Sequence, residues 1–158
     1  MNDLEKAKEI FRSHVCSHFI IYTDSEDLLS QYLSYNVDKN IELEWTREYI
    51  LEQFDELNDK NVIGKMYNFY RSGIYKFNDL MIKLCDELEK LYLNIDDSKI
   101  DKTIILLKLF QIMGKSKDAN IIKKTRIIML KIMLTIDESK LTRHGLNRYI
   151  DIKREIID

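Results

Sequence analysis

The feature that most constrains this chain is a nearly unbroken apolar run at residues 104–113, within the segment IDKTIILLKLFQIMG of residues 100–114. Only Lys108 and Gln111 interrupt the run. A surface helix carries one apolar stripe, whereas a helix that is apolar nearly all round is usually buried in a bundle. Lys108, Gln111 and Lys115 share one narrow strip, through which such a helix would still reach water. We therefore predict a central helix that the other helices surround.

The overall composition fits one globular domain over residues 1–158. The chain has no proline, and 45% of its 158 residues are hydrophobic and 33% are charged, which suits long uninterrupted helices. Its net charge is −2 with both signs interspersed, so we expect neither nucleic acid nor an anionic membrane as its main partner. We find no signal peptide, no run long enough for a membrane span and too few cysteines for a disulfide framework. These features predict a cytoplasmic protein.

Apolar residues at helical spacing predict helices along the whole chain, and no stretch long enough for a sheet alternates with the period of a strand. The expected helices cover residues 3–21, 26–35, 41–57, 62–71, 74–93, 100–114, 119–134 and 141–157. Gly73 is the expected stop of the fourth helix, and Asp97 or Ser98 is the expected cap of the central one. The two most apolar helices, at about 100–113 and 119–134, would form a central hairpin. The predicted fold class is all-α.

The only cluster with metal-ligand residue types is His14, Cys16 and His18. Two histidines four residues apart share a helix face, but the thiol points roughly 200° away from the first of them. A zinc site would also need ligands from elsewhere, and His144 offers no second half of such a site. Cys16 and Cys85 lie in helical patterns, where a free cysteine usually behaves as a small core residue. We expect no metal, no cofactor and no cysteine nucleophile.

An RNA-cleaving helical enzyme of the HEPN type is the enzymatic alternative. Such enzymes place an arginine several residues before the catalytic histidine. Here Arg143 directly precedes His144, and Arg12 lies only two positions before His14. The chain also lacks a glycine-rich phosphate loop, because its four glycines are isolated. We therefore predict that the protein is not an enzyme.

Aromatic residues crowd the junction of the fourth and fifth predicted helices. Five of them lie within eleven residues: Tyr67, Phe69, Tyr70, Tyr75 and Phe77. Some are expected to pack in the core, which is the ordinary role of aromatic residues at helical spacing. An aromatic-lined groove that accepts a helix of a partner protein is the functional alternative.

The predicted helix order resembles the Bcl-2 fold, because two strongly apolar helices joined by a tight link are surrounded by amphipathic ones. Residues 24–35, DSEDLLSQYLSY, look like the first helix of poxviral Bcl-2-like proteins, with an acidic start, aliphatic pairs and an aromatic end. The resemblance covers roughly residues 24–157 and leaves residues 1–22 as an additional N-terminal helix. It implies a Bcl-2-like helical bundle around the central hairpin.

The resemblance also implies two interaction surfaces. A partner-binding groove would be lined by Tyr67, Tyr70, Phe77, Met81 and Lys102, and a dimer face would lie near Tyr32, Tyr35 and Met129. Groove-binding cellular relatives carry an Asn-Trp-Gly-Arg motif at the start of their fifth helix, where this chain reads Lys99-Ile100-Asp101-Lys102. Lys102 keeps the positive charge of that arginine but not its planar fork.

Members of this family block host defence by binding. Some capture the BH3 helix of pro-apoptotic proteins, and others inhibit NF-κB or interferon-factor signalling, often as homodimers. The changed arginine motif and the lack of an apolar C-terminal anchor favour a cytosolic inhibitor of signalling. The resemblance thus implies a non-enzymatic viral protein that binds host proteins to inhibit innate immune signalling or apoptosis. A small bacterial or phage immunity or antitoxin protein that binds a cognate toxin is the alternative from another class.

Overall fold

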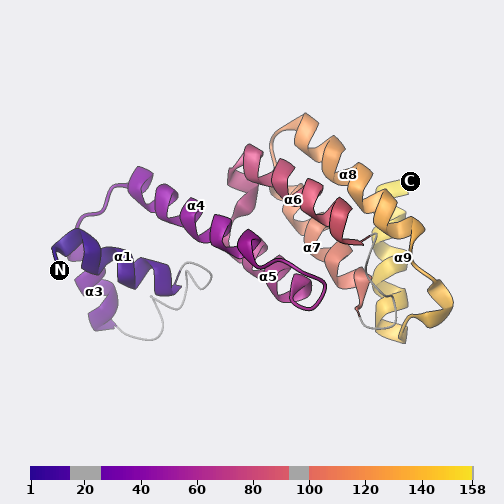
Figure 1. Ribbon diagram of the computed structural model, residues 1–158, viewed down its shortest axis with the longest axis horizontal. Coiled ribbons are helices and arrows are strands. Elements are labelled where there is room, and N and C mark those ends of the chain that lie inside the picture. Colours follow the sequence, from indigo (N-terminus) through magenta and orange to yellow (C-terminus); the bar gives the residue numbers. More distant parts are fainter. Residues whose placement is uncertain (15–25, 93–99, 158) are drawn as a thin grey trace. The chain divides into compact units, whose positions relative to one another are not determined.

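The computed structural model describes residues 1–14, 26–92 and 100–157, and every regular element within these ranges is a helix (Figure 1). The predicted all-α fold class is therefore confirmed. The chain divides into two compact units, Met1–Glu56 and Leu57–Asp158. Within the described ranges, no helix has both the length and the apolar character needed to cross a membrane.

The described part of the Met1–Glu56 unit is built from α1 (Asp3–His14), α3 (Glu26–Ser34) and α4 (Lys39–Asp55). Aromatic rings form its core, because the centroid of the Phe11 ring lies 6.2 Å from that of Tyr32 and 5.6 Å from that of Trp45. Asp38 caps α4 by accepting the backbone N–H of Asn40 at 2.7 Å. A capping carboxylate satisfies one of the free amides at a helix start, and α4 accordingly begins two residues earlier than predicted.

Polar contacts tie the other two helices of this unit to α4. Lys8 Nζ lies 2.7 Å from Glu48 Oε2, and Arg12 Nη1 lies 3.6 Å from the same oxygen. The Tyr32 hydroxyl donates a hydrogen bond to Glu42 Oε2 at 2.7 Å. Burial, and then the bond to this carboxylate, raise the pKa of Tyr32 above its ordinary value. The α1–α4 contact is thus ionic at its edge and aromatic inside.

The Leu57–Asp158 unit starts with α5 (Val62–Ser72), a 3₁₀ turn η1 (Ile74–Lys76) and α6 (Asn78–Tyr92). Gly73 ends α5 as predicted, with a left-handed φ of 77° and a backbone N–H that donates to the carbonyls of Phe69 and Tyr70. The prediction of one helix over residues 74–93 is wrong at its start. Phe77 has extended backbone angles (φ −122°, ψ 99°) and separates η1 from α6. Apolar spacing does not reveal such a break, because Ile74 is still buried.

The central helix of this unit is α7 (Lys102–Lys115), which packs against α5, η1, α8 (Ala119–Leu134) and α9 (Arg143–Ile157). Figure 1 shows α7 alongside α8 and α9. Ile105, Leu106, Leu109 and Ile112 of α7 are buried, as expected for the apolar run. The bounds of α8 are those predicted, and Asp118 caps it by accepting the backbone amides of its first turn.

The start of α7 differs from the prediction in its cap. The capping residue is Asp101, whose side chain accepts the N–H of Thr103 at 3.0 Å. Asp97 and Ser98, the predicted caps, lie outside the described residues. A carboxylate directly before the first helical turn satisfies free amides and favours the helix dipole, so the helix starts where this side chain can reach.

One arginine fastens α9 to the start of α7. Arg148 Nη1 donates to Thr103 Oγ1 at 2.9 Å and lies 3.3 Å from Asp101 Oδ2. Gly145, one turn earlier on α9, is buried in the same place, where an added Cβ would lie 3.2 Å from Thr142 Oγ1. The same Cβ would lie at ordinary van der Waals distance from the start of α7, 3.6 Å from Asp101 Oδ2 and 3.7 Å from Thr103 Oγ1, so α9 lies close to α7 at this position.

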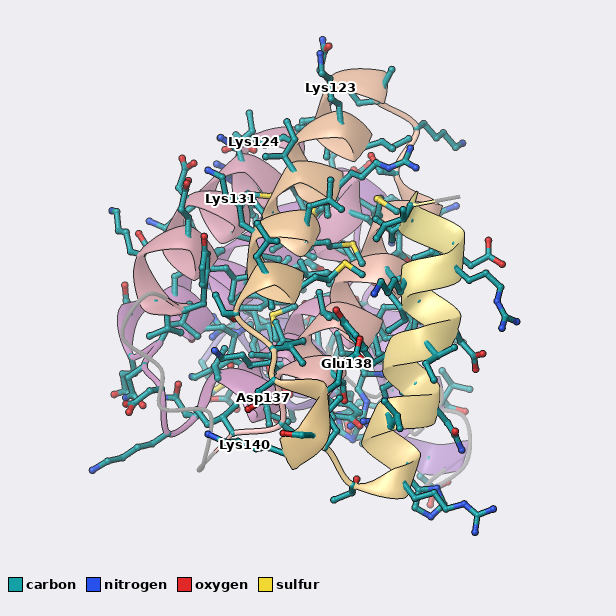
Figure 2. The ribbon with its side chains drawn as sticks, turned by 90° about the vertical axis from the view of Figure 1, so that its right-hand side faces the viewer. Lys123, Lys124, Lys131, Asp137, Glu138 and Lys140 are labelled. Atoms are coloured by element: carbon teal, nitrogen blue, oxygen red, sulfur yellow. The ribbon has the colours of Figure 1, made fainter. Side chains whose placement is uncertain are left out.

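Ion pairs join α8 to α6 along one face. Lys124 Nζ lies 2.9 Å from Asp86 Oδ1, and Lys131 pairs with Glu89. Figure 2 shows both lysines on α8, with Lys123 towards the start of this helix and the η2 turn (Glu138–Lys140) after its end. Lysines near the start of α8 and in the η2 turn after its end are therefore far apart along this helix.

Candidate functional site

Two of the five predicted groove residues, Tyr67 and Tyr70, meet a lysine of the central helix. Lys108 Nζ lies 4.1 Å from the centroid of the Tyr67 ring and 4.9 Å from that of Tyr70. Both tyrosines are on α5, three residues apart, so they share one face of the helix. Because α5 packs against α7, their rings cover the ammonium group, and only 8% of Lys108 is exposed.

A second cation, Arg71, completes what we call the Tyr–Lys cluster (Tyr67, Tyr70, Arg71 and Lys108). The Arg71 guanidinium carbon lies 5.6 Å from the centroid of the Tyr67 ring, and Arg71 itself is exposed. A cation over an aromatic face is attracted by the negative face of the ring. The same ring is thus approached by two positive charges.

No carboxylate of the described residues neutralises these two cations. Lys108 Nζ donates to the uncharged Gln111 Oε1 at 3.0 Å, and neither Lys108 nor Arg71 forms an ion pair within those residues. Burial, followed by the nearby charge of Arg71, lowers the pKa of Lys108 below the ordinary lysine value. Removing an ammonium from water without a counter-ion disfavours its charged form. The cluster is therefore a place where a negative charge would be stabilised.

The other predicted groove residues lie elsewhere. Phe77 is half-buried in the link between η1 and α6, and Met81 is fully buried. Lys102 is buried as well, and its Nζ donates to Thr135 Oγ1 at the end of α8 at 2.9 Å. Met81 and Lys102 therefore hold the helices of this unit together, and the positive charge beside the tyrosines comes from Lys108.

The residues of the predicted dimer face are mostly inside their own units. Tyr32 is buried in the aromatic core of the Met1–Glu56 unit, and Tyr35 is half-buried against that core. Met129 on α8 is fully buried. A buried side chain cannot contact a second copy of the chain without rearrangement. The homodimer stays a prediction.

The candidate metal and catalytic residues form no site in the described part of the chain. Cys16 and His18 lie outside it, and His14 Nδ1 is 2.9 Å from the carbonyl oxygen of Ile10, one turn earlier on α1. A search of the described residues finds no group of three metal-ligand side chains. His144 is exposed, and among these residues it has neither a hydrogen bond nor an ion pair.

The remaining thiol, Cys85, is buried as predicted between α6 and α8. Its Sγ lies 3.7 Å from Thr125 Oγ1, and burial raises the pKa of the thiol. A thiol whose pKa is raised is a weak nucleophile at neutral pH. The structure therefore places Cys85 in the core, as expected for a free cysteine in a helical pattern.

Sequence reasoning singled out the two tyrosines but missed Arg71 and Lys108. A signal for both was present: Lys108 is the only charged residue in the apolar run, and Arg71 follows Tyr67 by four residues. A cation that interrupts a buried helix needs a partner from a neighbouring helix, and aromatic faces on α5 supply one. The packing of the unit decides which neighbouring helix supplies this partner.

Comparison with protein-family models gave no match, and neither did comparison with curated proteins or with solved structures.

Proposed function

We propose that this chain is a non-enzymatic binding protein whose Tyr–Lys cluster receives an acidic side chain of a partner protein. The resemblance to poxviral Bcl-2-like proteins supplies the partner class. It points to a host protein of innate immune signalling, in the NF-κB or interferon pathways, and a host pro-apoptotic protein is the second candidate.

The observation that carries the proposal is the uncompensated charge of the cluster. Lys108 is more than nine-tenths buried without a carboxylate from the described residues, and the exposed Arg71 lies beside it. The Tyr67 and Tyr70 hydroxyls also have no hydrogen-bond partner among these residues. A carboxylate docked on Arg71 would also be close to the charge of Lys108, because both cations lie near the Tyr67 ring.

The arrangement of the helices supports the partner class. The cluster lies between α5 and α7, which the resemblance equates with the third and fifth helices of the Bcl-2-like bundle. The α7–α8 hairpin lies at the centre of its unit, with α5 and α9 packed on α7. A groove of that fold binds an amphipathic helix by a few anchors, and acidic residues on such a helix would complement the cluster.

Cell-based reporters test the proposed inhibition. The full chain is expressed in human cells that carry an NF-κB or an interferon-β reporter, and the pathway is then stimulated. We expect wild-type protein to lower at least one reporter. The Arg71→Glu variant, which reverses the exposed charge of the cluster, should lose that effect. The matched control Arg143→Glu changes another exposed arginine, at the start of α9, and should keep the inhibition.

Titration with BH3 peptides separates the two partner classes. Binding at micromolar concentration or tighter, lost in Arg71→Glu, assigns the protein to apoptosis. No binding to these peptides, together with a lowered reporter signal, indicates an inhibitor of innate immune signalling. A chain that lowers neither reporter and binds no BH3 peptide contradicts the proposal.

A further inference from the structure

A second cationic feature lies at one end of the Leu57–Asp158 unit, away from the tyrosines of the cluster. A cavity of about 580 Å³ opens between η1 and the link from α7 to α8. We call it the lysine pocket, and it is lined by Tyr75, Lys76, Asn78, Lys115, Lys117 and Asp118. Small-molecule sites usually have volumes of about 300–1,000 Å³, so the cavity can hold a molecule of nucleotide size.

Three lysines supply the charge of this pocket. Lys76, Lys115 and Lys117 are exposed, and within the described chain none of them forms an ion pair. Lys115 Nζ lies 5.6 Å from the centroid of the Tyr75 ring. The Lys76 side chain folds back on Gly73, where an added Cβ would be 3.4 Å from its Cε. Lys76 therefore lies against the turn at Gly73, whose left-handed φ of 77° favours glycine.

The single carboxylate of the pocket is already engaged. Asp118 Oδ1 accepts the backbone N–H groups of Asn120 at 2.8 Å and Ile121 at 3.2 Å. Asp118 Oδ2 accepts a hydrogen bond from Asn78 Nδ2 at 3.2 Å, which ties the start of α6 to the start of α8. Asp118 therefore links two walls of the pocket and keeps its negative charge, so the lining carries three lysines against one carboxylate.

We infer that the lysine pocket binds the phosphoryl groups of a small molecule of nucleotide size. Lysine ammonium groups bind phosphate as point charges, and three of them on two separate turns suit an anion with several charges. A ligand with a single carboxylate would leave most of the positive charge of the three lysines uncompensated. The Tyr75 ring offers a face for stacking an aromatic base.

This inference shares no residue with the Tyr–Lys cluster and stands apart from the proposed function. Calorimetric titration of the full chain with ATP and with pyrophosphate at low salt tests it. We expect both anions to bind, and Lys76→Gln or Lys117→Gln to weaken each roughly tenfold, the effect typical of losing one charge-assisted contact. Tyr75→Leu should weaken ATP more than pyrophosphate.

The control has to remove one positive charge far from the pocket. Lys140 serves, because Figure 2 shows it in the η2 turn after α8, whereas the pocket lies at the start of that helix. Lys140→Gln should leave both affinities unchanged. Failure of ATP and pyrophosphate to bind in the low-millimolar range would overturn the inference. So would a loss in Lys140→Gln equal to that in the pocket variants, because net charge alone would then explain the binding.

Discussion

The two units of this protein carry opposite net charge. The Met1–Glu56 unit has 5 lysines and arginines against 13 acidic residues, a net charge of −8. The Leu57–Asp158 unit has 20 against 14, a net charge of +6. The chain total of −2 conceals this division. A basic unit attracts anionic partners that the whole-chain charge does not suggest.

Both units contain cations that join helices, such as Lys124 with Asp86 in the basic unit, but the basic unit also holds two cations in another way. In the acidic unit, Lys8 and Arg12 on α1 both lie against Glu48 on α4, so cations join helices. In the basic unit, Lys108 and Lys115 rest on tyrosine rings and form no ion pair with a described residue. An ion pair already neutralises a cation within the fold, whereas the charges of the buried Lys108 and the exposed Lys115 have no described carboxylate to neutralise them. The comparison therefore supports the proposal that a partner binds the basic unit.

The largest expected effect tests whether apolar burial along α7 stabilises the basic unit. Leu109→Ala removes a fully buried side chain from the centre of α7 and should lower the free energy of unfolding by about 2–5 kcal/mol. Leu134→Ala on α8, where the side chain is 88% exposed, should change it by less than about 0.5 kcal/mol. Urea unfolding followed by circular dichroism measures both, and equal losses would show that α7 is not central.

The next effect concerns Arg148, one of the cations that join helices in the basic unit. Arg148→Ala breaks the contacts with Asp101 and Thr103 and should cost about 1.5–3 kcal/mol, as expected for part-buried hydrogen bonds to a charged group. Amide exchange on α9 should accelerate more than exchange on α6. Arg154→Ala, at an exposed position of the same helix, is the control, and a similar cost there would remove the special role of Arg148.

A smaller effect of opposite sign is expected at Lys108. Lys108→Met keeps the bulk of the side chain and removes a buried charge without a described counter-ion. Because such a charge is costly, the variant should be as stable as wild type or more stable by up to about 1 kcal/mol, the lost ring contacts offsetting part of the gain. It should also be weaker in the reporter assay. A loss of stability above that size would show that Lys108 serves the fold.

The stability difference between wild type and Lys108→Met should also depend on pH. The folded chain holds the pKa of Lys108 below its unfolded value, so between the two values the unfolded state binds more protons. Wild-type stability should therefore rise, relative to Lys108→Met, as the pH increases through that window towards about 10.4. Paired urea curves at neutral and alkaline pH measure the difference, and a difference that falls with pH contradicts the assigned shift.

The smallest expected effect is a difference between the two units in how salt changes their amide exchange. Added salt screens the exposed pairs of Lys8 and Arg12 with Glu48, so exchange of the α1 amides should speed up by an amount that corresponds to less than about 1 kcal/mol. The repulsion between Arg71 and Lys108 should instead weaken, and protection on α5 should hold or increase. Hydrogen exchange at low and high salt compares the two helices. A loss of protection on α5 as large as that on α1 would erase the distinction.

Sequence periodicity predicted the parts of the fold that follow from local pattern. The all-α class, the bounds of α8 and the stop at Gly73 each depend on apolar spacing or on one special residue. The break at Phe77 was not predictable in this way, because the buried Ile74 continues the pattern across it. The aromatic stretch pointed to Tyr67 and Tyr70, but Lys108 looked like a route to water. Its burial depends on how α5 packs on α7, which spacing within one helix does not determine.

The account depends most on Lys108 being a cation kept without a counter-ion inside its own unit. Titration of the lysine Cε signals by heteronuclear NMR, with Lys108 assigned from the signal missing in Lys108→Met, tests this directly. We predict a midpoint for Lys108 below the ordinary lysine pKa of about 10.4. A midpoint at that value would show that the ammonium is hydrated, and one above it would show that a carboxylate of this chain already neutralises it. Either result would contradict the proposed docking of an acidic partner group.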